Sequence, residues 1–118
     1  MTPQSWSKLA LELPEVVQKS HFGQPDFRVR GKIFAGLSRD GAQGNLKLRP
    51  DAQAELLARS AAFTPAAGAW GRSGWTHVTL AAASVREVRP LLLQAWQLVA
   101  PKALSSAPAP ATKPRRKR

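Results

Sequence analysis

Residues 16–49 are divided by turn residues into four short candidate strands, two of which alternate apolar and polar residues, and no other feature of the sequence limits the fold as strongly. The expected strands are residues 16–22, 26–30, 32–38 and 45–49. Glycine and proline mark the turns between them, at residues 21–25, at Gly31 and at residues 39–44. In the second run, Phe27 and Val29 alternate with charged residues, which is typical of a strand that buries one face. Because turns this short join antiparallel neighbours, the sequence predicts an antiparallel sheet.

Two segments with helical periodicity flank this region of the chain. In residues 3–13, one apolar stripe is formed by Trp6, Leu9, Ala10 and Leu13. In residues 50–59, a proline stands at the first position, where its missing N–H costs nothing. The side expected to be buried in this second helix holds Ala54, Leu57 and Ala58.

The rest of the folded region adds a strand and a helix. Residues 60–74 are rich in glycine and proline and are expected to be irregular, whereas residues 75–80 alternate as a last strand. Ser84 and Glu87 match a capping box, which would start a helix at Val85. Pro90 conflicts with that start because it removes an N–H and clashes with the preceding turn. We therefore expect a turn at 84–88 and a helix that begins near Arg89 and ends at about residue 99.

This order of elements predicts the fold class. Helices stand at both ends of the chain, and strands joined by hairpins lie between them. We expect an α+β two-layer sandwich, in which an antiparallel sheet carries its helices on one face. The other face of the sheet is then at least partly open.

The chain is strongly basic, with a formal net charge of +11 at pH 7. Residues 1–101 contain twelve lysines and arginines against seven acids, which leaves +5, and residues 102–118 contain six and no acid, which adds +6. Charge of this size attracts polyanions, namely DNA, RNA or an anionic membrane. No apolar run approaches the roughly 18 residues that a membrane span needs, and we expect no membrane partner.

The composition changes after Lys102, which divides the chain into two parts. Residues 1–102 are expected to fold, and residues 103–118 to be a disordered Ala/Pro spacer with a basic tail. The cations of the tail are Lys113, Arg115, Arg116, Lys117 and Arg118. Flexible cationic arms bind phosphates through counterion release. The alternatives are a tail that only promotes solubility, or a nuclear localisation signal if the source is eukaryotic.

Several motifs resemble the MmcQ/YjbR family in their order and spacing. They are HFGxPxFRVxGKIFA at 21–35, Lys47-Leu48, WGRxGW at 70–75 and AWxLVAPK at 95–102. The resemblance as a whole extends over about residues 9–102. The resemblance implies a fold similar to the bacterial frataxin-like (CyaY-like) sandwich. It also implies a DNA-binding role through strand hairpins described as a double wing.

By alternation, the open face of the sheet is expected to carry cations beside aromatic rings. The candidate nucleic-acid-binding cations of the folded part are Arg28, Arg30, Lys32, Lys47, Arg49 and Arg72. Their expected neighbours on the sheet are Trp75 and His77. Cations beside aromatics hold phosphates and stack unpaired bases. The alternative is a solvated face whose charges keep the protein soluble.

The WGRxGW motif has a structural and a ligand-binding interpretation. Its glycines indicate close backbone approach or positive φ. Trp70 and Trp75 either cap the edge of the core, which we favour, or form a ligand cage. Arg72 is placed to stack on an indole or to meet a phosphate.

Residue types that carry catalysis or bind metals are sparse. There is no cysteine, so thiol nucleophiles and Cys-ligated zinc are excluded, and His21 and His77 alone make a poor metal site. A frataxin-like fold suggests iron binding, but hard cations need clustered carboxylates and the seven acids of this chain are scattered. We therefore reject iron binding. We expect no enzyme, no cofactor and no metal.

The sequence therefore predicts a DNA-binding protein that is largely nonspecific. We expect it to be a monomer in the cytoplasm, associated with the nucleoid if the source is bacterial. Two alternatives stay open. One is RNA binding, because charge alone does not separate RNA from DNA. The other is a protein-interaction domain for an acidic partner or an exposed strand.

Overall fold

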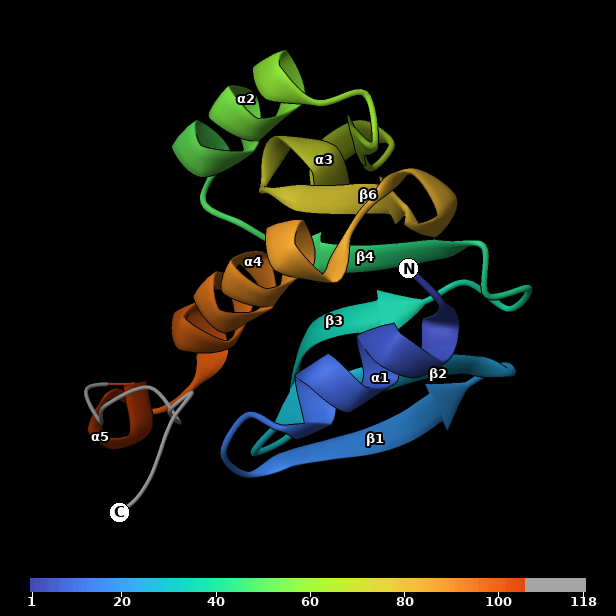
Figure 1. Ribbon diagram of the computed structural model, residues 1–118. Coiled ribbons are helices and arrows are strands. Elements are labelled where there is room, and N and C mark those ends of the chain that lie inside the picture. Colours follow the sequence, from blue (N-terminus) through green and yellow to red (C-terminus); the bar gives the residue numbers. More distant parts are fainter. Residues whose placement is uncertain (106–118) are drawn as a thin grey trace.

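The computed structural model describes residues 1–105, and its central feature is a six-stranded antiparallel sheet (Figure 1). The strands are β1 Val16–His21, β2 Gln24–Val29, β3 Lys32–Leu37, β4 Gln43–Lys47, β5 Phe63–Pro65 and β6 Trp75–Thr79. Their order across the sheet is β1-β2-β3-β4-β6-β5, so the first four strands form a meander and β1 and β5 are the edges. The predicted antiparallel sheet is confirmed.

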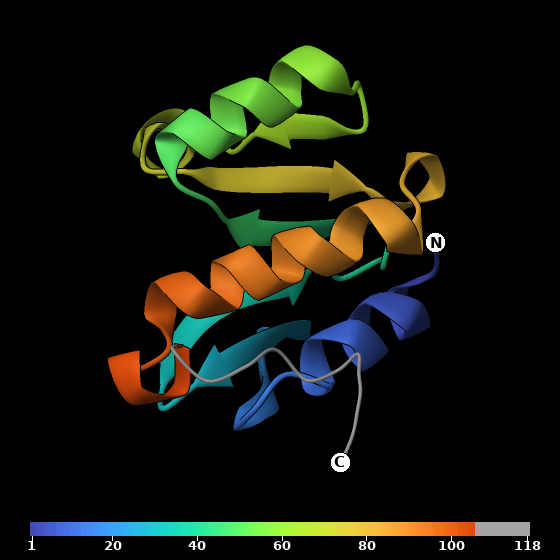
Figure 2. The same cartoon turned by 60° about the vertical axis from the view of Figure 1, so that its left-hand side comes forward.

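The helices pack mainly on one face of this sheet (Figure 2). They are α1 Pro3–Leu11, α2 Pro50–Arg59, α3 Gly68–Arg72, α4 Val85–Val99 and α5 Lys102–Ser105, with the 3-10 helix η1 Leu80–Ala82. Helices α1 and α4 contact each other and the sheet, and Gln53 of α2 donates a hydrogen bond of 3.1 Å to Thr76 Oγ1 of β6. The two-layer α+β sandwich is therefore confirmed. Within residues 1–105, no helix is both long and apolar enough to cross a bilayer.

The core lies between the two layers and contains the residues that periodicity placed there. Trp6 of α1 and both Phe27 and Val29 of β2 are fully buried. Strand β3 departs from strict alternation, because the β2–β3 register shifts after Phe27. As a result, the consecutive residues Phe34 and Ala35 are both buried, as a β-bulge permits.

The expectation that the last helix begins near Arg89 is wrong, because α4 begins at Val85. Ser84 Oγ accepts a hydrogen bond from the Glu87 N–H, and Glu87 Oε1 accepts one from the Ser84 N–H, each 3.1 Å long. The capping box therefore forms in full, and Pro90 lies inside the helix. The one hydrogen bond that Pro90 cannot donate is offset by this cap and by the buried apolar side of α4.

The buried side of α2 also differs from the prediction. Gln53 and Leu56 are buried, and Leu57 packs partly against the core as expected, whereas Ala54 and Ala58 are exposed. The side that faces the sheet therefore holds both leucines of the helix, and the two alanines, which would bury less apolar area, point away from it. The bounds expected for α2, residues 50–59, are confirmed.

Three further boundaries are corrected by the structure. The segment at 60–74, expected to be irregular, contains both β5 and α3. Helix α1 ends at Leu11 and not at residue 13. The first hairpin turn is tighter than expected, since Phe22 and Gly23 alone form it, with φ of 53° and 78°, and Pro25 belongs to β2.

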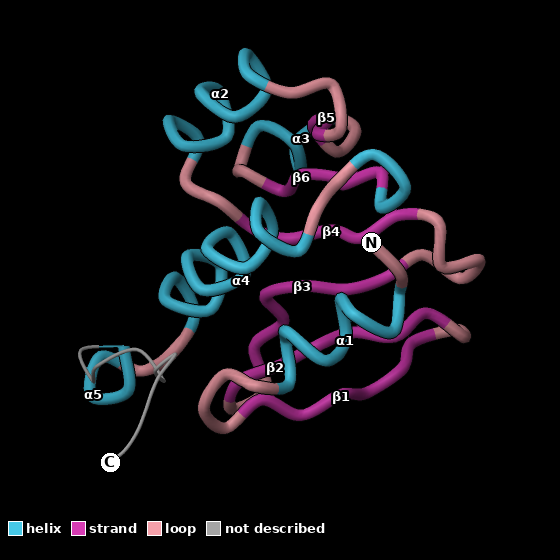
Figure 3. Tube along the Cα trace, in the orientation of Figure 1, coloured by secondary structure: helices cyan, strands magenta, loops and turns pink. Residues whose placement is uncertain are grey.

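The β1–β2 turn and the β3–β4 loop lie on the same side of the molecule (Figure 3). The guanidinium of Arg39, in the β3–β4 loop, donates a hydrogen bond to the Phe22 carbonyl oxygen in the β1–β2 turn. The tips of the two hairpins are thereby joined to each other.

Candidate nucleic-acid interface

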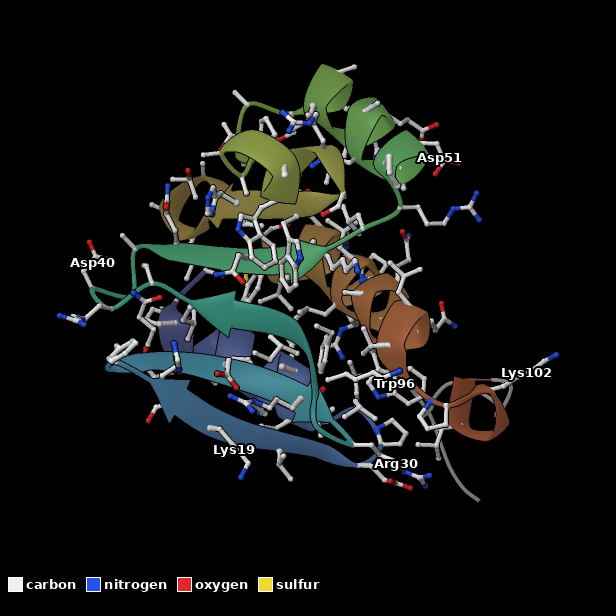
Figure 4. The ribbon with its side chains drawn as sticks, turned by 180° about the vertical axis from the view of Figure 1, so that it is seen from behind. Lys19, Arg30, Asp40, Asp51, Trp96 and Lys102 are labelled. Carbon is white, nitrogen blue, oxygen red and sulfur yellow. The ribbon has the colours of Figure 1, made fainter. Side chains whose placement is uncertain are left out.

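The sheet face opposite α1 and α4 is the one on which the sequence predicted a basic surface (Figure 4). The strand register aligns one row of residues across it: Lys19, Asp26, Gly36, Asn45, His77 and Thr64. Lys47 and Trp75 form a neighbouring pair on the same face, because residues two apart in a strand point to the same side. We call this surface the open face.

Arg28 lies on the open face but is already bound by a carboxylate. Its Nε is 2.7 Å from Asp26 Oδ1 and its Nη2 is 3.1 Å from Asp26 Oδ2. The side chains of Arg28 and Asp26 are only 25% and 10% exposed. A bidentate pair of this kind uses the donors that would bind a phosphate. Arg28 therefore orders the sheet surface and does not add a free cation to it.

Arg30 and Arg49 do not lie on the strand face, and in this respect the prediction is wrong. Strand β2 ends before Arg30, which occupies the β2–β3 turn with φ of 49°, and β4 ends before Arg49. Arg30 forms a bidentate pair with Glu15, with distances of 2.9 and 3.1 Å. This hydrogen bond lowers the pKa of Glu15. Arg49 pairs with Asp51 at 3.2 and 3.3 Å.

Lys32 is likewise separate from the row on the open face. It is exposed at the start of β3, but its register partner is Val29, a core residue. The neighbouring pair, Arg28 and Ile33, is the one that faces the open side. Alternation therefore assigned Lys32 to the correct strand and to the wrong side of it.

Most cations of the folded part make no ion pair. Of the twelve lysines and arginines in residues 1–101, four form ion pairs: Arg28, Arg30, Arg49 and Arg89. Within the described residues, those without an ion pair are Lys8, Lys19, Lys32, Arg39, Lys47, Arg59, Arg72 and Arg86. Lys19 belongs to the open face and was missed as a candidate, although its place in the strand at 16–22 was the available signal. The tail cations Lys113, Arg115, Arg116, Lys117 and Arg118 lie outside the described residues.

The two tryptophans of the WGRxGW motif meet at one end of the open face. Trp70 comes from α3 and Trp75 from β6, and their ring centroids are 6.4 Å apart at an angle of 73°. The glycines between them are required by close contacts. A Cβ on Gly71 would lie 1.9 Å from the Ala66 carbonyl oxygen, and one on Gly74 would lie 1.7 Å from that of Leu48. The interpretation of these glycines as points of close backbone approach is confirmed.

Acidic residues are unevenly distributed around the open face. Residues 56–86 include β5, α3 and β6 and contain no aspartate or glutamate. On the open face itself, the strand register places one acid, Asp26, and Arg28 neutralises it. The half of the open face built by β4, β6 and α3 is therefore basic and aromatic.

A hollow of about 320 Å³ lies on the other half of the open face, where His21, Asp26, Arg28 and Asn45 line it together with apolar residues that include Ile33. Its one carboxylate is held by Arg28. In the described part of the chain, no group of three His, Cys, Asp or Glu side chains is arranged to hold a metal ion. The hollow thus offers hydrogen-bonding groups without the ligand set of a metal centre.

These features define a small α+β sandwich with helices on one sheet face and an open, partly basic face opposite. The YjbR family model matches residues 11–98, and the chain belongs to the YjbR family. The resemblance seen in the sequence motifs is thereby confirmed.

Two solved structures share this fold. The Deinococcus radiodurans protein DR2400, which has a DUF419 domain, is 22% identical with a TM-score of 0.73, over 89% of this chain and 83% of that one. A Pseudomonas syringae protein is 18% identical with a TM-score of 0.68, over 84% of this chain and 99% of its own. The comparison with curated protein sequences gave no match. At these identities, the likeness establishes the fold.

Proposed function

We propose that this YjbR-family protein binds DNA with little sequence preference, using the open face and the basic tail together. The observation that carries the proposal is the set of cations on or beside the open face that make no ion pair within residues 1–105, namely Lys19, Lys47 and Arg72. Such cations are available to phosphates without first giving up a carboxylate partner.

The expected mode of binding is electrostatic. Each lysine or arginine that neutralises a phosphate releases a condensed counterion, so affinity falls as salt rises. Contacts of this type go to the backbone and carry no sequence information. The five tail cations add further phosphate contacts that do not depend on the geometry of the sheet.

The test compares two full-length variants with the same loss of charge. In the first, the open-face cations Lys19, Lys47 and Arg72 are replaced by glutamine. In the second, Lys8, Arg59 and Arg86, which belong to the helix layer and also make no ion pair within residues 1–105, are replaced by glutamine. Binding to a random duplex is measured at several salt concentrations.

We expect the open-face variant to lose affinity and to reduce the slope of log K against log salt by about 2 to 3, because three phosphate contacts are lost. In the helix-layer variant, the affinity and the salt slope should both change much less. Equal effects of the two variants would mean that the folded part has no oriented DNA-binding face.

In a third variant, glutamine replaces the five tail cations. It should bind more weakly than the wild type but not lose binding, and complete loss would assign all binding to the tail.

A second candidate function is supported by strand β1. It is an edge of the sheet, and five of its six residues are exposed. Val17 is 49% exposed there, and Phe22 at its end is 78% exposed. An exposed edge of this kind can accept a strand from a protein partner. A pull-down whose partners survive nuclease treatment would favour protein interaction, and an RNA competitor that displaces duplex DNA would favour RNA.

We propose no enzymatic role. Within residues 1–105, neither His21 nor His77 has a carboxylate or hydroxyl as a hydrogen-bond partner, so neither is arranged there as the base of a nucleophile–base pair. An assay that found turnover of a nucleic acid or a small molecule by the purified chain would overturn this proposal.

A further inference from the structure

We infer that Trp70 and Trp75, flanked by Lys47 and Arg72, form a stacking platform for the bases of single-stranded nucleic acid. This inference rests on the proposed function and specifies the kind of strand that this half of the open face receives. We call these four residues the platform.

The first observation is the exposure of Trp70. Its side chain is 68% exposed, whereas Trp6 and Trp96 are 0% and 3% exposed. Burying an indole is strongly favourable, so an indole left in solvent forgoes a large stabilisation. Trp75 is half-buried and touches Trp70 edge to face. A ring supported on one side by another ring has a face free for a further aromatic group.

The second observation is the charge around these rings. Lys47 is the direct register partner of Trp75 on the open face, and Arg72 is exposed in the same helix as Trp70. Neither cation makes an ion pair within residues 1–105. There is no acid anywhere in residues 56–86. The surroundings of the rings therefore suit a polyanion.

The third observation is that the platform is held in place by the backbone. Gly71 in α3 lies so close to Ala66, and Gly74 just after α3 so close to Leu48, that any side chain at either glycine would overlap a carbonyl oxygen. The segment just before α3 is also tied to β6, because the Ala66 N–H donates a 2.9 Å hydrogen bond to the Trp75 carbonyl oxygen. The rings are thus positioned before any ligand arrives, which limits the entropy lost on binding.

Together these features match a single strand better than a duplex. An aromatic ring stacks on any base, but only where the base is free of its neighbour, and bases in a duplex are already stacked and paired. Adjacent cations hold the phosphates of the same strand. Lys19, Lys47 and Arg72 can contact the phosphates of either duplex or single-stranded DNA, whereas the indole of Trp70 can stack only on the unpaired bases of a single strand.

The experiment uses the full chain with a 12-nucleotide mixed-sequence DNA strand, the same strand as a duplex, and an abasic strand that keeps the phosphates. Tryptophan fluorescence reports stacking, because two of the four tryptophans are buried and the other two form the platform. The variants are Trp70→Ala, Trp70→Phe and, as a matched control, Phe22→Ala. Phe22 is also an exposed ring in an edge-to-face contact, with His21, but it lies beside the opposite edge strand.

We expect Trp70→Ala to weaken single-strand binding by about 5- to 100-fold, the usual cost of losing one stacked base. Its duplex affinity should change by less than about twofold, since phosphate contacts are intact. Trp70→Phe keeps an aromatic face and should restore most of the affinity. Phe22→Ala should bind like the wild type. The abasic strand should bind wild type and Trp70→Ala equally, because it has no base to stack.

The possible failures can be told apart. If the wild type binds duplex with a normal salt slope but Trp70→Ala leaves single-strand affinity unchanged, the platform is overturned and the proposed function stands. The platform is also overturned if Phe22→Ala weakens binding as much as Trp70→Ala does. If the wild type binds neither form of DNA at low salt, both the platform and the proposed function fail.

Discussion

Gly44 shows how a single residue determines the fit between the two layers. It lies in β4, and a Cβ built on it would be 2.6 Å from Trp6 Cη2 and 2.7 Å from Trp6 Cζ2. The Trp6 ring is fully buried in the core, so it has no room to move away. The absence of a side chain at Gly44 therefore allows α1 to pack directly on the sheet.

We predict that Gly44→Ala lowers the free energy of unfolding by about 1–3 kcal/mol, the usual cost of overpacking a core. Gly44 does not have positive φ, so the cost comes from the clash and not from backbone strain. Urea denaturation measures the change. The control is the same substitution in a Trp6→Phe background, where the smaller ring relieves the clash. Trp6 Nε1 has no hydrogen-bond partner within residues 1–105, so this background loses no such bond. A cost that is the same in both backgrounds would contradict the explanation.

At the scale of elements, helix α4 has a complete N-terminal capping box but also a proline in its interior. The capping box of Ser84 and Glu87 begins the helix, and Pro90 is its sixth residue. Proline cannot donate a hydrogen bond to the carbonyl four residues earlier, that of Arg86. Pro90 is exposed, so its ring adds little to the core.

We therefore predict that Pro90→Ala raises the free energy of unfolding, by roughly 1–3 kcal/mol, because it restores a backbone hydrogen bond and removes the clash. The comparison variant, Ser84→Ala, removes the cap of the same helix and should lower stability by about 1 kcal/mol. Thermal and urea denaturation of both variants provide the measurement. A Pro90→Ala protein less stable than the wild type would show that the proline ring itself supports the packing of α4.

The elements also show why some features could be predicted and others could not. Short-range patterns predicted the meander and the bounds of α2, because alternation and an N-terminal proline act within a few residues. The start of α4 was misjudged because the penalty of Pro90 was weighed without the burial that the rest of the helix gains. Helix α3 was missed because it has five residues and two glycines, and its position depends on contacts with Ala66 and Leu48.

The candidate site was predicted only in part, for a related reason. Alternation correctly placed Arg28 and Lys47 on one face. Arg30 is neutralised by Glu15, which is 15 positions away and comes close only when β1 pairs with β2. Ion pairs formed by tertiary structure cannot be counted from a net charge. The number of cations available to a ligand therefore had to come from the structure.

At the scale of the whole molecule, three exposed carboxylates link stability to pH. The Arg30 hydrogen bond lowers the pKa of Glu15 from its ordinary value of 4.5. The pKa of Asp40 lies below its ordinary 3.8, because the Ala42 N–H and the Ser38 hydroxyl both donate to it. The Ala52 N–H, and then Arg49, lower the pKa of Asp51 in the same direction. In each case the folded state holds the ionised form more strongly than the unfolded chain does.

A pKa that is lower in the folded state means that the unfolded chain binds more protons at acidic pH, so stability rises with pH in that range. The contribution of each carboxylate to stability is fully present above its ordinary pKa and is lost as pH falls through the lowered pKa.

We predict that the urea midpoint is steady between pH 7 and about pH 5 and decreases at lower pH. The Glu15→Gln variant should be less stable than wild type at pH 7. The difference should shrink as pH falls below the ordinary pKa of 4.5, and it should close once wild-type Glu15 is protonated in the folded state as well. If the difference between Glu15→Gln and wild type stays constant down to pH 3, the Arg30–Glu15 pair does not contribute to the acid sensitivity, and general charge repulsion accounts for it.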